Sequence, residues 1–256
     1  MADILTAVII ARDAAETIDA CVRALAFCDR VWVAENRSQD DTAERARAAG
    51  AEVVSVPWEG YARTKNRLLD QIDEGWILSV DADEIATPAL GHEIRARLDA
   101  AEGVDGYWVS RRNYFLGREI RHAGWSPDWQ LRLIRAGTGR FEERRVHEGL
   151  RVDGPTARLC ERLPHYTYPD LESYVRRFNA YTTLAARDRL ARGRRFSIGR
   201  LLGDPPWTFF RMYVLKGGAA DGMEGFILCV LSALNTFVKH AKHWALCRTG
   251  RCSGDA

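Results

Sequence analysis

Three acidic residues follow a short apolar stretch in the segment GWILSVDADEIA, residues 75–86. Residues 76–80 are apolar apart from one serine, and they predict a buried strand. Asp81, Asp83 and Glu84 then stand almost together at its end. Carboxylates held this close repel one another and lose solvation energy, so the arrangement needs something positive to complete it. The spacing therefore points to a bound cation, or to a reaction that uses the group.

Several chemistries could use this spacing. A calcium loop of the EF-hand type is excluded, because its sixth and twelfth positions need glycine and glutamate, and here they are Ala86 and His92. A phosphotransferase with an aspartate nucleophile usually carries the pair after its first strand, whereas here the pair follows the fourth. A solvated loop, with Asp81 capping a turn, stays open. The remaining interpretation is a divalent cation that bridges the carboxylates to a diphosphate.

The first half of the chain alternates predicted strands and helices. The apolar segments LTAVIIA, RVWVAE, AEVVSVP and WILSV read as strands, and the segments between them have helical spacing. This alternation predicts an α/β fold with a mostly parallel sheet, in which ligands bind beyond the carboxyl ends of the strands. Asp13, Glu35 and Asp81 each lie at or just after such an end, so we expect them along one edge of the sheet.

The second half of the chain does not continue this alternation of strands and helices. Residues 106–150 read as strands and hairpins rich in arginine and aromatic residues, and a long helix is predicted from Leu171 to about Arg192. The segment GFILCVLSALNTFVKHAKHW near the end has an apolar core that is short for a membrane span, which needs ~20 apolar residues. It suits a helix in the membrane interface or one packed on the protein. We expect two domains, 1–168 and 169–256.

Charge is unevenly spread along the 256 residues, although the net charge is only +2. From Leu171 onwards the net charge is +8, and before it −6. The acidic front could hold a cation, and the basic tail could face an anionic surface. The hydrophobic content of 46% excludes a disordered chain. The six cysteines form no C-x-x-C pair and the start lacks the pattern of a signal peptide, so we expect reduced thiols in the cytoplasm.

Several segments together resemble family 2 glycosyltransferases with the GT-A fold. They are VIIARDAAETIDACVRALAFCDRVWVAENRSQDDT, WEGYARTKNRLL, GWILSVDADE, RRNYFLGREIRHAGWSPDWQLRLIR and FEERRVHEGL. Within that family they are most similar to the bacterial enzymes that add a sugar to the inner core of lipopolysaccharide. The resemblance runs from about Leu5 to Trp244, and it implies a GT-A-type, Rossmann-like sheet flanked by helices, with a basic helical extension at the C-terminus.

The resemblance implies roles for the acidic group and for two residues further along. Asp81 and Asp83 match the family's D-x-D motif, with Asp83 as the contact to Mg²⁺ or Mn²⁺ and Asp81 on the donor side. Asp128 matches the catalytic base of an inverting transfer, although after a proline it could also just cap a turn. His147 matches a ligand for the metal or the phosphates, although with Glu148 it could form an ordinary buried pair.

The donor pocket is implied in the same way. Asp13 and Glu35 match the residues that meet the base and ribose of the nucleotide, and Lys65 matches a contact to the diphosphate, although a lysine on a helix is often simply solvated. The sequence departs from the family here, because AENRSQDDT replaces the usual VDSGSTD.T and puts Glu35 and Arg37 where Asp and Gly are common. These changes leave the identity of the donor open.

The resemblance also implies partners: a nucleotide-sugar donor, UDP-glucose by analogy, and an anionic glycolipid acceptor at the cytoplasmic face of the bacterial inner membrane. The arginines between residues 192 and 200 would meet its phosphates, and Trp207, Phe209 and Phe210 would sit at headgroup level. No nucleic-acid module is recognisable, so we expect no nucleic acid. A different glycan product and an inactive nucleotide-sugar-binding scaffold stay open, and so does the oligomeric state.

Overall fold

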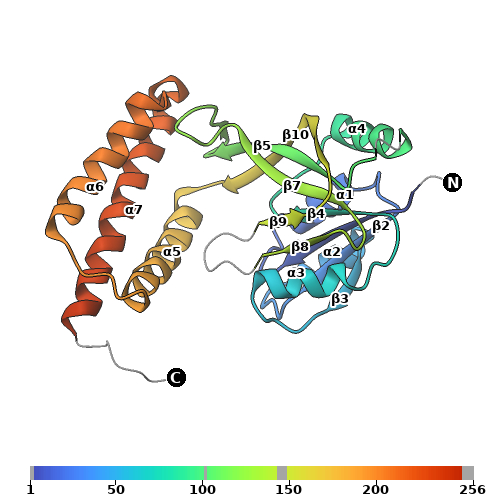
Figure 1. Cartoon of the computed structure of the whole chain (residues 1–256), viewed down its shortest axis with the longest axis horizontal. Helices are drawn as coiled ribbons and strands as arrows, with labels where there is room; N and C mark the ends of the chain where they lie inside the picture. Colours follow the sequence, from blue (N-terminus) through green and yellow to red (C-terminus); the bar gives the residue numbers. More distant parts are fainter. Residues whose placement is uncertain (1–2, 101–102, 143–148, 250–256) are drawn as a thin grey trace. The chain divides into compact units, whose positions relative to one another are not determined.

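The chain forms two compact units, described here from a computed structural model (Figure 1). The described residues are 3–100, 103–142 and 149–249. The first unit comprises residues 1–112 and 128–166, and the second comprises residues 113–127 and 167–256. The division into domains 1–168 and 169–256 stays a prediction. Cys21, Cys28, Cys160, Cys229 and Cys247 are all free thiols.

A mixed sheet is the centre of the first unit, with strand order β10-β5-β7-β4-β1-β2-β3. The four strands β3, β2, β1 and β4 run parallel, β7 pairs antiparallel with β4, and β5 pairs antiparallel with β7. This confirms the expected α/β, GT-A-like fold with a largely parallel sheet. The strands are β1 Leu5–Ala11, β2 Arg30–Glu35, β3 Glu52–Ser55, β4 Trp76–Asp81, β5 Gly106–Phe115, β6 Arg118–Glu119, β7 Asp128–Arg135, β8 Gly139–Phe141, β9 Leu150–Val152 and β10 Thr156–Tyr168.

Helices cover both faces of this sheet, and the alternation of side chains explains why the strands are apolar throughout. Leu5, Ala7 and Ile9 of β1 belong to the core cluster that includes residues of α1 and α4. Val8, between them, belongs to the cluster that includes residues of α3. The helices of this unit are α1 Ile18–Ala24, α2 Thr42–Ala48, α3 Tyr61–Leu69 and α4 Pro88–Asp99.

The register of the parallel strands brings their carboxyl ends to one edge. In the ladder Ala11 pairs with Glu35, and Ile10 pairs with Asp81. The expectation that Asp13, Glu35 and Asp81 gather along one edge of the sheet therefore holds for their positions on the backbone.

One irregularity interrupts the antiparallel part of the sheet. Tyr107 of β5 pairs with Leu133 of β7, but the next residue, Trp108, pairs with Leu131. Arg132 is thus an extra residue on β7 with no register partner on β5. A bulge of this kind re-aims a side chain out of the regular alternation.

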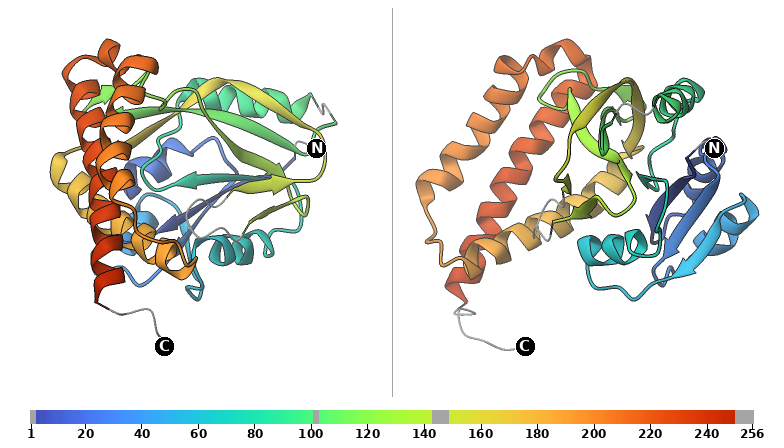
Figure 2. Two further views of the ribbon diagram at one scale, coloured as in Figure 1. Left: turned by 60° about the vertical axis from the view of Figure 1, so that its left-hand side comes forward. Right: turned by 45° about the vertical axis from the view of Figure 1, so that its right-hand side comes forward.

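The second unit is built on three helices, with α7 packed against both α5 and α6 (Figures 1 and 2). The predicted long helix is present as α5, whose N-cap Asp170 accepts a hydrogen bond from the Ser173 amide at 2.7 Å. A small core of mainly apolar and aromatic side chains, including Phe115, Tyr174 and Leu228, holds the unit together. The helical segments are α5 Leu171–Ala191, α6 Ile198–Phe210, η1 Arg211–Leu215, η2 Gly218–Asp221 and α7 Gly222–Arg248.

Gly75 lies just before β4 and packs closely against the backbone at Ile4. Its φ is +77°, and a Cβ there would lie 2.1 Å from the backbone oxygen of Ile4. Gly137 has a similar φ of +78° but open space around it. We expect Gly137→Ala to cost about 1 to 2 kcal/mol from the left-handed backbone alone, and Gly75→Ala about 1 to 3 kcal/mol more from the clash. Urea unfolding followed by circular dichroism measures both, and equal losses would contradict this packing.

Candidate active site

The acidic group forms a closed turn at the end of β4. The Glu84 amide donates to the Asp81 carbonyl at 2.9 Å, and the Glu84 carboxylate accepts from the Asp81 amide at 2.8 Å. Glu84 has no exposed surface. The turn that was expected in the solvated-loop interpretation exists, but the loop is not solvated, because one of its three carboxylates is completely buried.

Two cations compensate the charge of this turn. Arg132 of β7, whose side chain is 7% exposed, donates through Nη2 to both the Asp81 and the Glu84 carboxylates. Lys65 of α3 reaches the other Asp81 oxygen from 3.1 Å, and its ammonium lies 4.9 Å from the ring centroid of Phe141. Each Asp81 oxygen therefore has its own cation, and Lys65 is a buried partner of Asp81 in this structure rather than a solvated residue.

A third cation extends the network to Asp128. Arg111 of β5 donates through Nε to Asp128 Oδ2 at 2.7 Å, and its Nη1 lies 3.5 Å from Glu84 and 3.9 Å from Asp81. The other Asp128 oxygen accepts from Gln130 Nε2 at 2.7 Å. The structure thus brings the predicted base into the same cluster as the D-x-D motif. Its carboxylate is 23% exposed, so an acceptor can reach it.

The electrostatics of the cluster separate its two inner carboxylates. Burial alone would raise the pKa of Asp81, but the attraction of Arg132 and Lys65 outweighs it and holds that pKa well below its usual range. Burial, together with repulsion from Asp81, raises the pKa of Glu84 even though Arg132 opposes this. The Arg132 guanidinium has its pKa raised, since its two carboxylates outweigh the effect of burial. Asp81 is therefore the firmly charged member of the pair.

Asp83 points to a different neighbour. Its Oδ1 lies 3.4 Å from His165 Nε2, and its carbonyl accepts from the Tyr166 amide at 2.9 Å. Both contacts come from β10, which also pairs with Glu84 through an isolated bridge at His165. Asp83 is 17% exposed and sits at the same turn as the buried pair, so its orientation is set by β4 on one side and β10 on the other.

The donor chemistry of Asp83 fits a hard divalent cation. No group of three or more potential ligands gathers among the described residues. Mg²⁺ needs no such cage, since it is commonly held by one or two carboxylates together with phosphate oxygens and water. Asp83 can supply one carboxylate, whereas both oxygens of Asp81 are already in ion pairs. The predicted ligand His147 lies outside the described residues.

Asp13 and Glu35 shape the loop that follows β2. Asp13, in a left-handed conformation with φ 49°, accepts from the Gln39 amide at 2.7 Å, and its own amide donates to Ser38 Oγ at 3.1 Å. The Glu35 carboxylate accepts from the Ser38 amide. Arg37 within this loop is also left-handed, with φ 49°. The two predicted donor-site acids, one after β1 and one at the end of β2, therefore both bind backbone amides of the loop that follows β2.

Sequence reasoning missed Arg111, Arg132 and His165. All three lie on strands β5, β7 and β10, which were read only as strands and hairpins rich in arginine and aromatic residues. The one available signal was the pattern LRLIR, where Arg132 stands among apolar residues, and in the structure residues 131–134 are all buried. A charged residue in a buried strand is expected to have a partner, and the acidic turn is the unmatched charge elsewhere in the chain.

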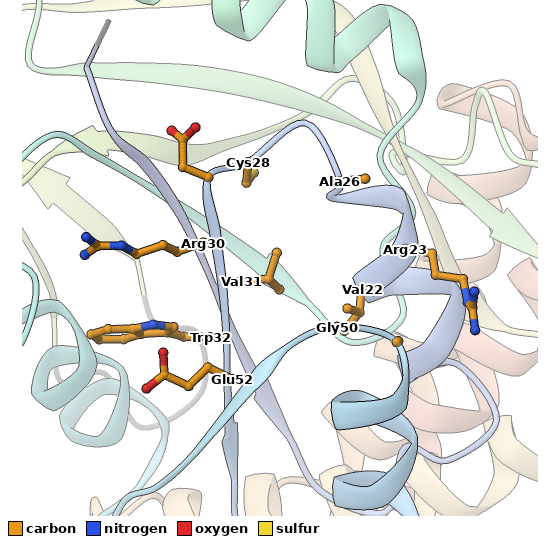
Figure 3. A pocket seen from close by; sticks show the side chains of 11 residues that line it. Val22, Arg23, Ala26, Cys28, Arg30, Val31, Trp32, Gly50 and Glu52 are labelled. Carbon is orange, nitrogen blue, oxygen red and sulfur yellow. The ribbon is translucent and has the colours of Figure 1, made fainter. Parts of the chain in front are cut away.

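A cavity of about 610 Å³ lies at the other end of the strands (Figure 3). It is lined by Arg30 and Glu52, the first residues of β2 and β3, and by residues of α1 such as Val22. Glu35 and Asp81 mark the opposite, carboxyl ends of the sheet. The acidic cluster and this cavity are therefore separate features.

Comparison with known proteins identifies the family. The model of "Glycosyl transferase family 2" matches residues 6–162, a range that contains the acidic turn, Lys65, Arg111, Asp128 and Arg132. The chain belongs to this family. It is a glycosyltransferase, as the sequence resemblance implied, and its fold is that of a GT-A-type family 2 enzyme.

Two relatives of this family 2 enzyme align over most of its length. The lipopolysaccharide core biosynthesis glycosyltransferase LpsC of Rhizobium meliloti is 30% identical over 93% of this chain and 91% of its own. An uncharacterized glycosyltransferase of Rickettsia typhi is 26% identical over 84% of this chain and 77% of its own.

A solved structure aligns with part of the family 2 enzyme. Glucosyl-3-phosphoglycerate synthase from Mycobacterium tuberculosis, solved with Mn²⁺, UDP and glucosyl-3-phosphoglycerate, is 25% identical over 44% of each chain with a TM-score of 0.37. The same protein has been solved with Mg²⁺ and UDP. Because this chain matches less than half of that structure, the likeness carries no argument about its own ligands.

The buried ion pair makes a specific stability prediction. Arg132→Met leaves Asp81 and Glu84 without their shared cation, and we expect it to lower the free energy of unfolding by about 3 to 5 kcal/mol. The double variant Arg132→Met with Glu84→Gln removes one of the stranded charges and should recover part of that loss. Urea unfolding of both variants and of Glu84→Gln alone completes the cycle.

Arg140→Met is the matched control, because Arg140 pairs with Asp70 at 2.5 Å while its side chain is 64% exposed. Exposed pairs contribute about 0 to 1 kcal/mol, so this variant should unfold almost like the parent. If the losses of unfolding free energy in Arg132→Met and Glu84→Gln simply add up in the double variant, the two side chains are not coupled.

Proposed function

We propose that this glycosyltransferase moves glucose from UDP-glucose to the inner core of lipopolysaccharide, with inversion at the anomeric carbon and with Mg²⁺ or Mn²⁺. The observation that supports this is that Arg111 ties Asp128, which we assign as the base, to Asp81 and Glu84 of the turn that also carries Asp83, which we assign to the metal. The near full-length likeness to LpsC supports the acceptor class.

Asp83 would hold the metal ion, with His147 as the predicted second ligand. When bound, the ion neutralises the negative charge that builds up on the leaving diphosphate. Lys65 and Arg132 act indirectly in this scheme, because they fix Asp81 and so the turn that carries Asp83. Asp13 and Glu35 fix the loop that follows β2 through its backbone amides. In this scheme that loop would meet the base and ribose of the nucleotide.

Asp128 would be the general base. Arg111 and Gln130 each hold one of its oxygens, which fixes the carboxylate in one orientation. The acceptor hydroxyl gives its proton to Asp128 as its oxygen bonds to the anomeric carbon. The bond from that carbon to the diphosphate breaks on the opposite side, which inverts the configuration. Arg111 is a positioning residue in this step.

The basic second unit supports an anionic glycolipid as acceptor. The chain from Leu171 onwards carries a net charge of +8, and arginine pairs well with phosphates and acidic sugars. We place the reaction at the cytoplasmic face of the inner membrane, where a nucleotide sugar and a membrane-anchored acceptor can meet. An acceptor that belongs to another glycan, such as a capsule or a lipid-linked precursor, is the second candidate on the same charge argument.

The metal assignment predicts the binding of nucleotides. UDP should bind in the presence of Mn²⁺ and lose most of that affinity without it, because the diphosphate charge is then left uncompensated. Asp83→Ala should remove this dependence on metal. Isothermal titration of the parent with UDP, GDP and CMP, each with and without Mn²⁺, measures the effect and names the donor's nucleotide.

Asp153→Ala is the control for this titration, since the Asp153 carboxylate is 88% exposed and lies on the segment between β9 and β10. It should bind UDP like the parent. Undiminished Mn²⁺-dependent affinity in Asp83→Ala would remove Asp83 from the metal site.

The base assignment predicts a loss of turnover without a loss of binding. Asp128→Asn keeps a hydrogen-bonding side chain of the same size but cannot take up the proton, so we expect turnover to fall by roughly 10²–10⁴-fold. Donor affinity measured by the same titration should stay close to that of the parent. Transfer at nearly the parent's rate in Asp128→Asn would rule out this aspartate as the base.

A further inference from the structure

The outer surface of α6 and η1 is apolar. None of the residues of α6 is buried, although the helix packs against α7. Ile198 and Leu202 are 65% and 64% exposed, and Trp207, Phe210 and Leu215 are 55%, 45% and 60% exposed. The other exposed residues between 198 and 215 are glycine, proline and valine, apart from two arginines. A surface of this kind on a helix marks a missing partner.

Helix α7 continues the apolar surface. Met223 is 66% exposed and Phe226 is 42% exposed. The Phe226 ring lies 6.0 Å from that of Phe209 and 5.7 Å from that of Tyr213, so the exposed surfaces of the two helices meet at this aromatic cluster. Further exposed apolar residues follow along α7 at helical spacing, namely Val230, Leu234, Phe237 and Trp244.

Positive charge accompanies this surface. Between residues 193 and 216 the exposed ionisable side chains are cations, namely Arg194, Arg195, Arg200, Arg211 and Lys216. The single acid of this segment, Asp204, has its Oδ2 2.9 Å from His240 Nε2 of α7. Apolar side chains with flanking cations fit a bilayer that has negatively charged headgroups. A second copy of the chain fits poorly, because its cations would face these cations.

The helical segment Gly218–Arg248, which comprises η2 and α7, is also long and apolar enough to cross a membrane by length and composition alone. Its polar contacts argue against this. Lys242 Nζ lies within 2.7 to 2.8 Å of four oxygens on α5, from Asn179, Thr182 and Thr183. A spanning α7 would have to separate from α5 and give up these bonds. A unit that lies on the surface keeps them.

We propose that α6, η1 and the start of α7 dock on an anionic phospholipid bilayer, with Ile198, Leu202, Trp207, Phe210 and Leu215 in the acyl region and the flanking cations on the lipid phosphates. This inference rests on the membrane location in the proposed function and deepens it by naming the surface that docks, but it depends neither on the donor sugar nor on the metal. It would hold the enzyme where a membrane-anchored acceptor is found.

Flotation of the full chain with vesicles tests the docking. The protein should float with vesicles that contain phosphatidylglycerol and bind much more weakly to pure phosphatidylcholine. Leu202→Gln with Phe210→Gln should weaken binding to the anionic vesicles by roughly tenfold or more, because two side chains lose their transfer into lipid. Arg195→Gln with Arg200→Gln should weaken it too, with a smaller loss at high salt.

Val175→Gln with Leu184→Gln is the matched control, because these α5 residues are 54% and 58% exposed and lie outside the proposed surface. It should bind vesicles like the parent. All variants should keep their thermal midpoint and their Mn²⁺-dependent affinity for UDP, so a failure of docking is distinct from a failure of the proposed function.

Three results would overturn the inference. The first is undiminished binding of both the apolar and the arginine variants to anionic vesicles. The second is retention of the protein in vesicles after alkaline carbonate extraction, which would indicate a spanning helix. The third is a dimer in sedimentation that disappears in the Leu202 and Phe210 variant while vesicles bind neither protein.

Discussion

A guanidinium buried between two carboxylates is the interaction on which the carboxyl edge of the sheet depends. Two unit charges about 4 Å apart interact by roughly 4 kcal/mol at the effective dielectric of a protein, so Asp81 and Glu84 could not share one turn without Arg132. Lys65 and Arg111 complete the compensation from two other elements. Parallel strand β4 supplies the negative charge of this site, and antiparallel strands β7 and β5 supply most of the positive charge.

The alternating half of the fold could be predicted because its signals are local. Apolar segments of strand length separated by amphipathic helices fix a parallel sheet, and a parallel sheet fixes where Asp13, Glu35 and Asp81 must lie. The long helix α5 was also readable from its own spacing. The D-x-D motif and Asp128 were found through resemblance to a family, and the structure brings them together through Arg111.

The pairing of the cations with the acidic turn could not be predicted, because it depends on contacts between elements that lie far apart in the sequence. Arg132 is 51 residues from Asp81, and Lys65 is 16 residues from it. Nothing local to Arg111 distinguishes it from the exposed arginines nearby, and the apolar neighbours of Arg132 indicate that it is buried but do not name its partner. Trp207 and Phe210 of α6 were expected at a membrane, but composition could not show how far the exposed apolar surface extends, because it does not tell which neighbours a helix lacks.

The extra residue in β7 ties the shape of the sheet to the charge of the site. Leu131 and Ile134 pack in one core cluster and Leu133 in the other, a pattern that a regular strand cannot produce. The residue that breaks the alternation is Arg132 itself. A one-residue deletion here would restore a regular ladder and at the same time remove the guanidinium. This chain cannot have both a regular β5–β7 ladder and an arginine between Asp81 and Glu84. The bulge in β7 is therefore the feature that has to be kept.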